Sequence, residues 1–451
     1  MNEKELLIKI DSENTAKLFA ELYGDNKVDA NRKRYKKLIF EMLADNSDEF
    51  HNIKENMRIF SAPGRTELAG NHTDHNRGKV LAASIQLDNV AIVQKRDDCI
   101  VFFRSTGFPD VKVKLTDKNG APDLQPKPEE KGTTEALIRG IAAELSNRGC
   151  KTGGFSANAN SNVFAGSGLS SSAALESLIC RIFDSLYGEG KRSALEIAQI
   201  GQIAENSFFG KPCGLMDQIA CAAGGAVAID FADTLRPTVK QINFDPAADG
   251  YALCVVNTGG SHADLTADYA SIPAEMKAVA AFFGKSVLSE LEKETVLSRA
   301  AEARKSLGDR AFLRAIHFFN ENERVDAMTA ILLEMERAAT TADRQQALSR
   351  YLDLVNESGD SSWEFLQNVY SPARPETQGI AAALALTKDF FRKQKLRGAC
   401  RVHGGGFAGT IQAYIPLDAI DSYRKNIEAV FGNDSLTAIK IRSKGVTELT
   451  I

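Results

Sequence analysis

The chain has 451 residues, of which 43% are hydrophobic and 25% are charged. This is the composition of a soluble protein, and the length favours two domains over one. The net charge of −4, with both signs spread along the sequence, argues against a nucleic acid or an anionic membrane as the main partner.

The seven cysteines are scattered and form no C-x-x-C pair. This pattern favours reduced thiols in a cytosol and gives no sign of a zinc site. No apolar run approaches the roughly 18 residues that a membrane span needs, and the first residues lack the pattern of a signal peptide. We therefore expect a cytoplasmic protein without a membrane segment.

Residues 1–50 show apolar side chains at helical spacing among many charges, which predicts a helical extension that caps the rest of the chain. Strand-like segments follow, then a polar loop and a helix. The expected strands are 58–62, 80–85, 89–94 and 100–103, the loop is 116–132 and the helix is 134–145.

Residues 166–174 read Gly-Ser-Gly-Leu-Ser-Ser-Ser-Ala-Ala and precede an apolar stripe of helical period that ends at Gly188. Glycines let backbone N–H groups approach an anion, and a helix N-terminus favours negative charge, so this segment predicts a phosphate cradle. The serines can cap the helix and still offer a hydroxyl to a metal or phosphate oxygen. A serine cap after a flexible linker is the alternative. The segment is not a Walker loop, because G-x-x-x-x-G-K-[ST] does not occur.

A further helix is expected over 193–208, and strands over 227–230 and 253–257. The second half is mainly helical and closes with strands, which predicts an α+β fold with a boundary near residue 255. Its expected helices are 273–283, 287–306, 310–320, 324–339 and 342–358, and its strands are 400–402, 410–415 and 437–441. We expect a helical extension over 1–50, an N-terminal domain over 51–255 and a C-terminal domain over 256–451.

A polar cluster surrounds the turn at Pro63 and Gly64, which can aim Arg65. The sequence Gly-Asn-His-Thr-Asp-His-Asn over 70–76 then offers the donors and acceptors that a polyhydroxyl ligand needs. A solvated turn is an alternative, and so is a metal site, although neighbours in a loop do not share a face as H-E-x-x-H does on a helix.

Two carboxylates, Glu205 and Asp217, flank a turn at Gly210 and Pro212. One acid could hold a divalent cation beside phosphates while the other accepts a proton from a hydroxyl. Either could instead be a surface charge or a helix cap. Asp217 has apolar neighbours, where an unpaired carboxylate is costly, so we expect Arg65 to pair with it.

The sequence His-Gly-Gly-Gly-Phe-Ala-Gly-Thr over 403–410 contains a formal G-x-G-x-x-G match. A strand-like segment follows it rather than a helix, so it does not predict dinucleotide binding. We expect a glycine-rich turn that brings the backbone close to a ligand or to the serine-rich segment, or else a tight hairpin.

In this order, these segments resemble the GHMP kinases, and among them the galactokinase family. GRTELAGNHTDHN is similar to the sugar signature, GLSSSA to the phosphate loop, PCGLMDQ to the catalytic segment, HADLTADYASIPAEM to the sugar-side segment and GGGFAG to the C-terminal loop. The resemblance implies a two-domain α+β GHMP kinase fold with mixed sheets and helices and an active site in the interdomain cleft. It also implies ATP-dependent phosphorylation of the anomeric hydroxyl of a hexose, with galactose as the leading candidate.

The resemblance also implies a role for each matching residue. Asp217 would be the catalytic base, with Arg65 as its partner. Mg²⁺ would be held by Ser172, or Ser171 in its place, and by Glu205. The sugar pocket and the ATP-binding segment are implied as follows: Arg65, Asn71, His72, Asp74, Gly214, Asp217 and Tyr269 for the sugar, and Gly166, Ser167, Gly168, Leu169, Ser170, Ser171, Ser172 and Ala173 for ATP.

Three positions depart from the galactokinase pattern. Asn71 stands where a Glu is usual, Thr134 where a Trp commonly packs near adenine, and Phe164 where a Pro is common. Asn71 motivates a second interpretation, in which the same fold phosphorylates an N-acetylhexosamine, a pentose or a uronic acid. A catalytically silent sugar sensor is a third, although the complete set of named residues favours catalysis. The expected partners are a small sugar and a nucleotide, with the protein a monomer or weak homo-oligomer.

Overall fold

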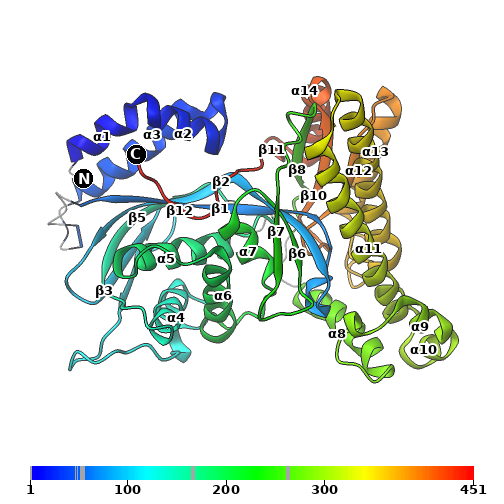
Figure 1. The fold of residues 1–451 in the computed structure, drawn as a ribbon, viewed down its shortest axis with the longest axis horizontal. Coiled ribbons are helices and arrows are strands. Elements are labelled where there is room, and N and C mark those ends of the chain that lie inside the picture. The colour runs from blue at the N-terminus through cyan, green and yellow to red at the C-terminus, as the bar shows by residue number, and fades with distance from the viewer. Residues whose placement is uncertain (1–2, 46, 48, 51–55, 164–167, 261–264) are drawn as a thin grey trace.

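The computed structural model describes residues 3–45, 47, 49–50, 56–163, 168–260 and 265–451 (Figure 1). Two sheets organise these residues, and helices cover them on several sides. The arrangement is the mixed α+β architecture that the sequence predicts. Among the described helices, none combines the length and apolarity that crossing a membrane requires.

The larger sheet has eight strands within the described residues, in the order β12-β1-β2-β5-β3-β4, with β6 paired to β2 and β7 to β6. All its pairs are antiparallel except β3 with β5. The strands are β1 (Arg58–Ala69), β2 (Lys79–Lys95), β3 (Ile100–Ser105), β4 (Val111–Lys114), β5 (Phe155–Ser161), β6 (Ala226–Asp230), β7 (Thr238–Ile242) and β12 (Thr447–Glu448).

Helices cover the two faces of this sheet (Figure 1). One face packs on α4 (Thr134–Asn147), α5 (Ser171–Tyr187) and α6 (Ala194–Ala204), through a core that includes Phe60, Phe155 and Phe183. The N-terminal extension covers the opposite face. It comprises α1 (Glu3–Asp11), α2 (Glu13–Tyr23) and α3 (Val28–Ala44), which share a second core with Ile59, Val90, Ile92 and Phe102. The extension therefore buries part of the sheet, as a cap would.

The smaller sheet has the order β11-β8-β10-β9. Its strands are β8 (Tyr251–Asn257), β9 (Ala399–His403), β10 (Thr410–Pro416) and β11 (Leu436–Ile439). The helices of the second half are α8 (Thr266–Phe282), α9 (Lys293–Ser298), α10 (Ala300–Leu307), α11 (Asp309–Arg337), α12 (Thr341–Ser361), α13 (Gly379–Gln394) and α14 (Ile420–Phe431). The chain enters this sheet at β8 and returns to the larger sheet at β12.

Several elements differ from the sequence-based expectation. The strand expected to end near Ala62 runs to Ala69, because a bulge between Pro63 and Arg65 accommodates the proline. The two helices expected over 310–339 are one, α11, because the polar residue Glu321 is buried there and pairs with Arg324. The helix expected over 287–306 is instead interrupted at Arg299.

Seven of the described helices and strands have no counterpart in the expectation: β4, β5, β7, β12, α7 (Met216–Ala223), α13 and α14. The β5 sequence, Phe-Ser-Ala-Asn-Ala-Asn-Ser, is rich in residues that favour turns. Its Asn158 is nevertheless buried, and its amide donates to the carbonyl of Leu38 at 2.9 Å. A contact with α3 thus satisfies a polar group that the local sequence would leave in solvent.

Candidate active site

Arg65 lies in β1 and connects two segments that are far apart in the sequence. Its Nε and Nη2 atoms both lie 2.8 Å from Oδ1 of Asp217. Its Nη1 donates to the carbonyl of Gly168, and its backbone N–H donates to the carbonyl of Leu169 at 3.0 Å. The expected ion pair is therefore present, and it adjoins the serine-rich segment.

The glycine before Arg65 is required by this close approach. A Cβ on Gly64 would lie 2.6 Å from the carbonyl oxygen of Leu169 and 3.0 Å from Cγ1 of Val163. Any other residue would push the serine-rich segment away from β1. The Pro-Gly turn thus does more than aim Arg65, because it also makes room for the chain that approaches it.

Asp217 occupies the first turn of α7, with 34% of its side-chain surface exposed. Burial alone would raise the pKa of its carboxyl, but Arg65 and a hydrogen bond from Ser170 outweigh burial and hold the pKa below its usual range. The carboxylate is therefore ionised at neutral pH and open on one side. An ionised, oriented and accessible carboxylate can act as a general base.

The serine-rich segment turns sharply before α5 begins. Gly168 and Ser170 both have left-handed backbone conformations, with φ of 70° and 58°, and the side chain of Leu169 between them is buried. Ser171 and Ser172 form the first turn of α5, and Ala173 is buried behind them. Gly166 and Ser167, together with Phe164, lie outside the described residues.

Ser170 departs from the expected role of a helix cap. It stands at the N-cap position of α5, but its side chain makes no capping hydrogen bond. Its Oγ donates instead to Oδ2 of Asp217. The first backbone N–H groups of α5 therefore lack this serine as an internal acceptor, which suits a helix N-terminus that meets an anion.

Glu205 begins a π-helical turn, Glu205–Phe209, that directly follows α6. The amide nitrogen of Gln218 donates to both Glu205 and Glu176, at 3.0 Å each, and Lys211 lies 3.4 Å from Glu205. Glu176 is about one helical turn after Ser172 on α5, so the two residues share a face of that helix. Burial, reinforced by Glu205, raises the pKa of Glu176 well above its usual value.

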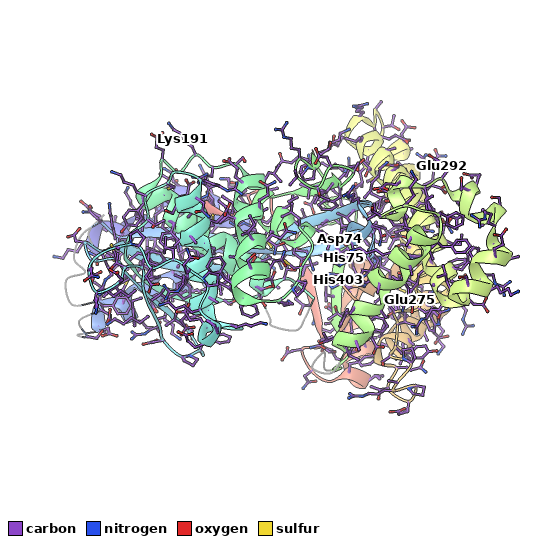
Figure 2. The ribbon with its side chains drawn as sticks, turned by 90° about the horizontal axis from the view of Figure 1, so that it is seen from below. Asp74, His75, Lys191, Glu275, Glu292 and His403 are labelled. Carbon is purple, nitrogen blue, oxygen red and sulfur yellow. The ribbon has the colours of Figure 1, made fainter. Side chains whose placement is uncertain are left out.

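The signature loop between β1 and β2 contacts the catalytic segment. A Cβ on Gly214 would overlap Oδ2 of Asp74, so the Asp74 carboxylate packs directly against the backbone of Gly214. His72 has a φ of 62°, and its Nε2 lies 2.9 Å from the carbonyl of Gly405. In the view of Figure 2, Asp74 and His403 are both labelled between the two halves of the molecule.

Tyr269 approaches the same region from α8. Its hydroxyl donates to the carbonyl of Gly406 at 2.8 Å, and its ring packs edge-on against Phe407 with 5.4 Å between centroids. A Cβ on Gly405 would overlap the Tyr269 ring. The tyrosine is therefore fixed by the glycine-rich turn, on the side where His72 also contacts that turn.

Asn71 has its side chain occupied by protein groups. Its Nδ2 donates to Glu67 at 3.0 Å and to the carbonyl of Gly404 at 2.6 Å, while its Oδ1 accepts from Asn368 at 2.7 Å. The residue is 1% exposed. In this conformation the amide joins the signature loop to the second half of the chain.

The glycine-rich turn between β9 and β10 packs against the serine-rich segment, one of the two contacts expected for it. A Cβ on Gly404 would lie 3.8 Å from Cα of Gly168. His403 lies 3.0 Å from both Thr66 and Thr410 through its two ring nitrogens. The strand β10 follows this turn, so the formal G-x-G-x-x-G match is not a dinucleotide motif.

Sequence reasoning did not identify Asn368, His403 or Gln218 as parts of the site. Asn368 lies in an irregular segment after α12 and gives no motif signal. His403 shows in the sequence only as the first residue before a glycine-rich turn. Gln218 had a signal, since it directly follows Asp217 on a buried helical turn, where an amide needs a partner.

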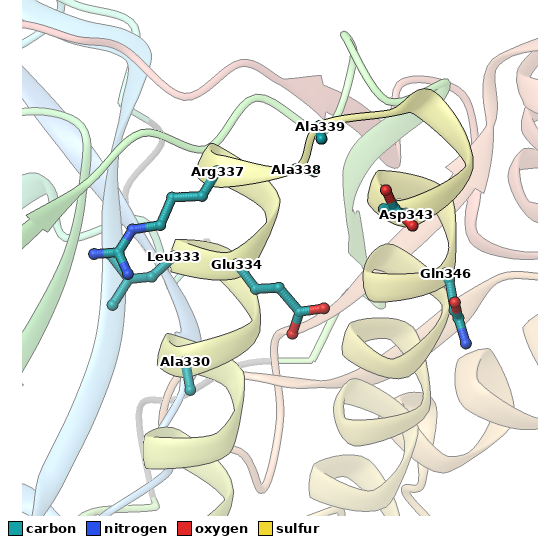
Figure 3. A pocket seen from close by; sticks show the side chains of 8 residues that line it. All are labelled: Ala330, Leu333, Glu334, Arg337, Ala338, Ala339, Asp343 and Gln346. Atoms are coloured by element: carbon teal, nitrogen blue, oxygen red, sulfur yellow. The ribbon is translucent and has the colours of Figure 1, made fainter.

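In the part of the chain that the structure describes, neither a metal centre nor the pocket elsewhere on the molecule is an alternative to this site. Within the described residues, no three His, Cys, Asp or Glu side chains gather as a metal centre would need. A separate pocket of about 560 Å³ lies at the turn between α11 and α12, where Glu334 and Arg337 line it (Figure 3). None of the expected site residues borders that pocket.

Comparisons with known proteins agree with this geometry. The family profile described as GHMP kinases N terminal domain matches residues 136–225, and the one described as galactokinase galactose-binding signature matches residues 48–95. A galactokinase of Streptomyces coelicolor is 31% identical over 388 residues, covering 85% of this chain and 91% of the relative. A galactokinase of Glaesserella parasuis is 32% identical over 378 residues, covering 81% and 87%.

The fold has solved counterparts. The structure of Lactococcus lactis galactokinase complexed with galactose has a TM-score of 0.70 and 24% identity, and covers 97% of this chain and 99% of that one. A mevalonate kinase structure has a TM-score of 0.54 over 86% of this chain. With relatives above 30% identity over most of its length and both profiles matched, the chain belongs to the galactokinase family of the GHMP kinases.

Proposed function

We propose that the protein transfers the γ-phosphoryl group of ATP to the anomeric hydroxyl of galactose. The observation that carries this proposal is the position of Asp217, which Arg65 keeps ionised beside Gly168 and Ser170 of the serine-rich segment. In a chain of the galactokinase family, this position supports a role for Asp217 as the base next to the segment expected to bind phosphate.

The reaction needs one proton transfer and one displacement. Asp217 accepts the proton of the anomeric hydroxyl, the sugar oxygen forms a bond to the γ-phosphorus, and the bond from that phosphorus to the bridging oxygen of ADP breaks. Arg65 holds the carboxylate and favours negative charge that develops on the sugar oxygen. Most of the acceleration in phosphoryl transfer comes from such positioning and charge neutralisation.

The expected magnesium ligands have suitable chemistry. Mg²⁺ prefers oxygen ligands and commonly takes one or two from protein, with the rest from phosphates and water. Ser172 and Glu205 would supply a hydroxyl and a carboxylate oxygen at the edge of the Gln218 cluster. When bound, the ion would neutralise charge on the phosphates. The segment Gly166–Ala173 would hold those phosphates through backbone N–H groups.

The sugar would lie between the signature loop and the second half of the chain. Asp74, Gly214, His72 and Tyr269 converge there, and Asp217 would face the anomeric carbon. Burial lowers the pKa of His72, so its imidazole is neutral at pH 7. A neutral ring and a carboxylate give the mixture of donors and acceptors that hydroxyl groups require.

Asn71 supports a second candidate, 1-phosphorylation of another sugar such as an N-acetylhexosamine, a pentose or a uronic acid. Its amide is neutral where galactokinases usually carry a Glu, and its hydrogen-bonding groups already face protein partners. The usual carboxylate contact is therefore missing at this position. We infer further that the enzyme works in the cytoplasm as a monomer or weak homo-oligomer, in keeping with its seven free thiols.

A panel of monosaccharides with MgATP tests the proposal. ADP release identifies the accepted sugars, and ³¹P and ¹³C NMR locate the new phosphate. We expect galactose to be the best substrate and the phosphate to be on C1. Phosphate on another carbon would contradict the proposed reaction. A sugar that is a better substrate than galactose would support the second candidate. Binding of sugar and ATP without turnover would indicate a catalytically silent sugar sensor.

A further inference from the structure

Arg34 of the N-terminal extension makes a dense set of contacts with the larger sheet. Its guanidinium donates four hydrogen bonds, to Oδ1 and the carbonyl of Asn160 at 2.7 and 2.9 Å, and to Oδ1 and the carbonyl of Asp88 at 2.6 and 3.0 Å. The planar fork of arginine suits this geometry, since lysine cannot reach several acceptors at fixed angles.

Asp88 is fully buried and gathers partners from distant parts of the chain. Arg34 binds one carboxylate oxygen, while Tyr23 and Arg442 lie 2.7 and 3.0 Å from the other. Burial alone would raise the pKa of Asp88, but Arg34 and Arg442 hold it below its usual range. Since Arg442 remains in place without Arg34, the carboxylate keeps one buried cation if Arg34 is changed.

Arg34 binds the C-terminal end of β5, and the serine-rich segment follows β5 in the sequence. Asn160 is the penultimate residue of β5, and the backbone N–H of Asn162 donates to the carbonyl of Asp88 at 2.9 Å. Arg34 donates to that same carbonyl. The helical extension therefore holds the backbone on both sides of the point where the chain leaves the sheet.

A chain of contacts joins this strand end to Arg65, the partner of Asp217. Val163 follows this strand end and packs against Gly64, which also faces the carbonyl of Leu169 in the serine-rich segment. The backbone N–H of Arg65 donates to that carbonyl. A displacement at Asn160 would thus be transmitted through Val163 to the place where β1 meets the serine-rich segment.

We propose that Arg34 is a positioning residue for nucleotide binding, through which the N-terminal extension fixes the strand end that precedes the phosphate-binding segment. This inference rests on the proposed function only for the assignment of the nucleotide to that segment. It gives the extension a role in affinity for ATP, beyond covering the sheet.

The test compares variants of the full chain in direct nucleotide binding and in kinetics. Arg34→Lys keeps a cation near Asp88 and removes the fork, while Asn160→Ala removes one acceptor and leaves Asp88 untouched. Arg32→Ala on the same helix is the control, because Arg32 bonds only to Asp29 and to the carbonyls of Asp11 and Ser12 in the described structure. Calorimetry with ADP and with a non-hydrolysable ATP analogue gives Kd, and thermal unfolding gives Tm.

We expect Arg34→Lys to raise the Kd and the KM for MgATP by about tenfold, because ordering the displaced segment on binding then lowers the binding free energy. Asn160→Ala should raise both in the same direction, while the KM for galactose stays within about twofold in each. Arg32→Ala should leave all three unchanged. A lower Tm with nucleotide affinity within twofold of wild type in both test variants would overturn the proposal.

The binding measurement separates this inference from the proposed reaction. If the wild-type protein binds nucleotide but does not phosphorylate galactose, the proposed function fails, yet the effect of Arg34→Lys on Kd still decides the inference. If Arg34→Lys does not fold, Asn160→Ala decides it alone, because that side chain is only partly buried.

Discussion

Arg65 binds a single carboxylate oxygen of Asp217 with two nitrogens, each at 2.8 Å. The other oxygen, Oδ2, accepts from Ser170. This arrangement lowers the proton affinity of the carboxylate and fixes its orientation, and it leaves one side of the group open. The predictions below test the consequences of that geometry and of the contacts around it.

Removal of the Ser170 hydroxyl should change the pH dependence of the reaction. The hydrogen bond from Ser170 is one of the interactions that depress the pKa of Asp217. Without it the pKa rises, so the acid limb of kcat/KM should move to higher pH, by roughly one unit if the bond contributes about 1.5 kcal/mol. Profiles of kcat/KM for galactose at saturating MgATP measure the shift.

Ser170→Gly is the better of two variants for this measurement. Ser170 has a φ of 58°, a conformation that glycine adopts without strain, whereas Ser170→Ala keeps the side-chain penalty. Both should show the same shift, although only the glycine variant should keep or gain stability. An unchanged acid limb in both would show that Ser170 does not tune the base.

Gly214→Ala should weaken sugar binding selectively. The added methyl group would overlap Oδ2 of Asp74, so the Asp74 side chain must move from its position beside Gly214. A displacement of about 1 Å can cost on the order of 100-fold in a positioned site. We expect the KM for galactose to rise by at least about tenfold, with the KM for MgATP little changed.

The control for this prediction is Gly284→Ala. That glycine has a φ of 71° and nothing within 4 Å of the added methyl group, so it reports backbone strain without a contact at the site. It should alter Tm more than kinetics. Equal effects of both variants on the KM for galactose would remove Asp74 and Gly214 from the sugar pocket.

Asn71→Glu tests whether this position contacts the sugar. Burial raises the pKa of the neighbouring Glu67, and a second carboxyl at position 71 would lose the donors to Glu67 and Gly404. We expect a loss of about 2–4 kcal/mol in the free energy of unfolding, as for other broken buried networks. We also expect a changed ranking among sugars epimeric at one carbon.

Asn71→Gln is the matched variant, because it keeps the amide and changes only the length. It should lose less stability than Asn71→Glu. If Asn71→Glu leaves the ranking of the sugars untouched in a folded protein, Asn71 is structural and lies outside the pocket.

Much of this site could be predicted from local sequence. The glycines and serines before an apolar stripe predict an anion-binding helix start. An acid among apolar neighbours requires a cationic partner, and the Arg65–Asp217 pair supplies one. The helix after the serine-rich segment begins at Ser171 and ends before Gly188, as its periodicity indicates. These features depend on a few adjacent residues.

Other features depend on contacts between distant residues. The turn-forming residues of β5 are stabilised by α3, and the Ser170 hydroxyl turns from its own helix to Asp217. The chain returns to the first sheet at β12 because β12 pairs with β1. The side chains of Arg58 and Glu448, which are in contact there, are 390 residues apart in the sequence. Local propensity carries no information on such partners, so these parts could not be predicted.

Glu321 should make the protein sensitive to acid. Its carboxylate is buried and accepts from the N–H of Gly70 at 3.0 Å and from Ser358 at 2.6 Å. Burial would raise its pKa, but Arg324 above all lowers it to about 2. A carboxyl whose pKa is lower in the folded than in the unfolded protein stabilises the fold at any pH above its unfolded pKa. This stabilisation is lost as the pH falls, here between about pH 4.5 and pH 2.

Glu321→Gln removes that contribution, at a cost of about 3 kcal/mol near pH 7 because Arg324 loses its buried carboxylate partner and keeps only the exposed Glu357. Urea unfolding of both proteins should therefore show a difference that shrinks as pH falls below about 4.5. Glu323→Gln, at an exposed position of the same helix, should change little. A difference between wild type and Glu321→Gln that stays constant down to pH 3 would contradict the assignment.

The most direct test of the central claim is the turnover number of Asp217→Asn at saturating galactose and MgATP, measured with its galactose Kd. Loss of the base should lower kcat by about 10²–10⁴ while the Kd stays near that of wild type, because the proton is accepted only in the transition state. A folded Asp217→Asn protein that retains more than about a tenth of wild-type kcat, a loss of no more than roughly 1.4 kcal/mol, would show that Asp217 is not the base.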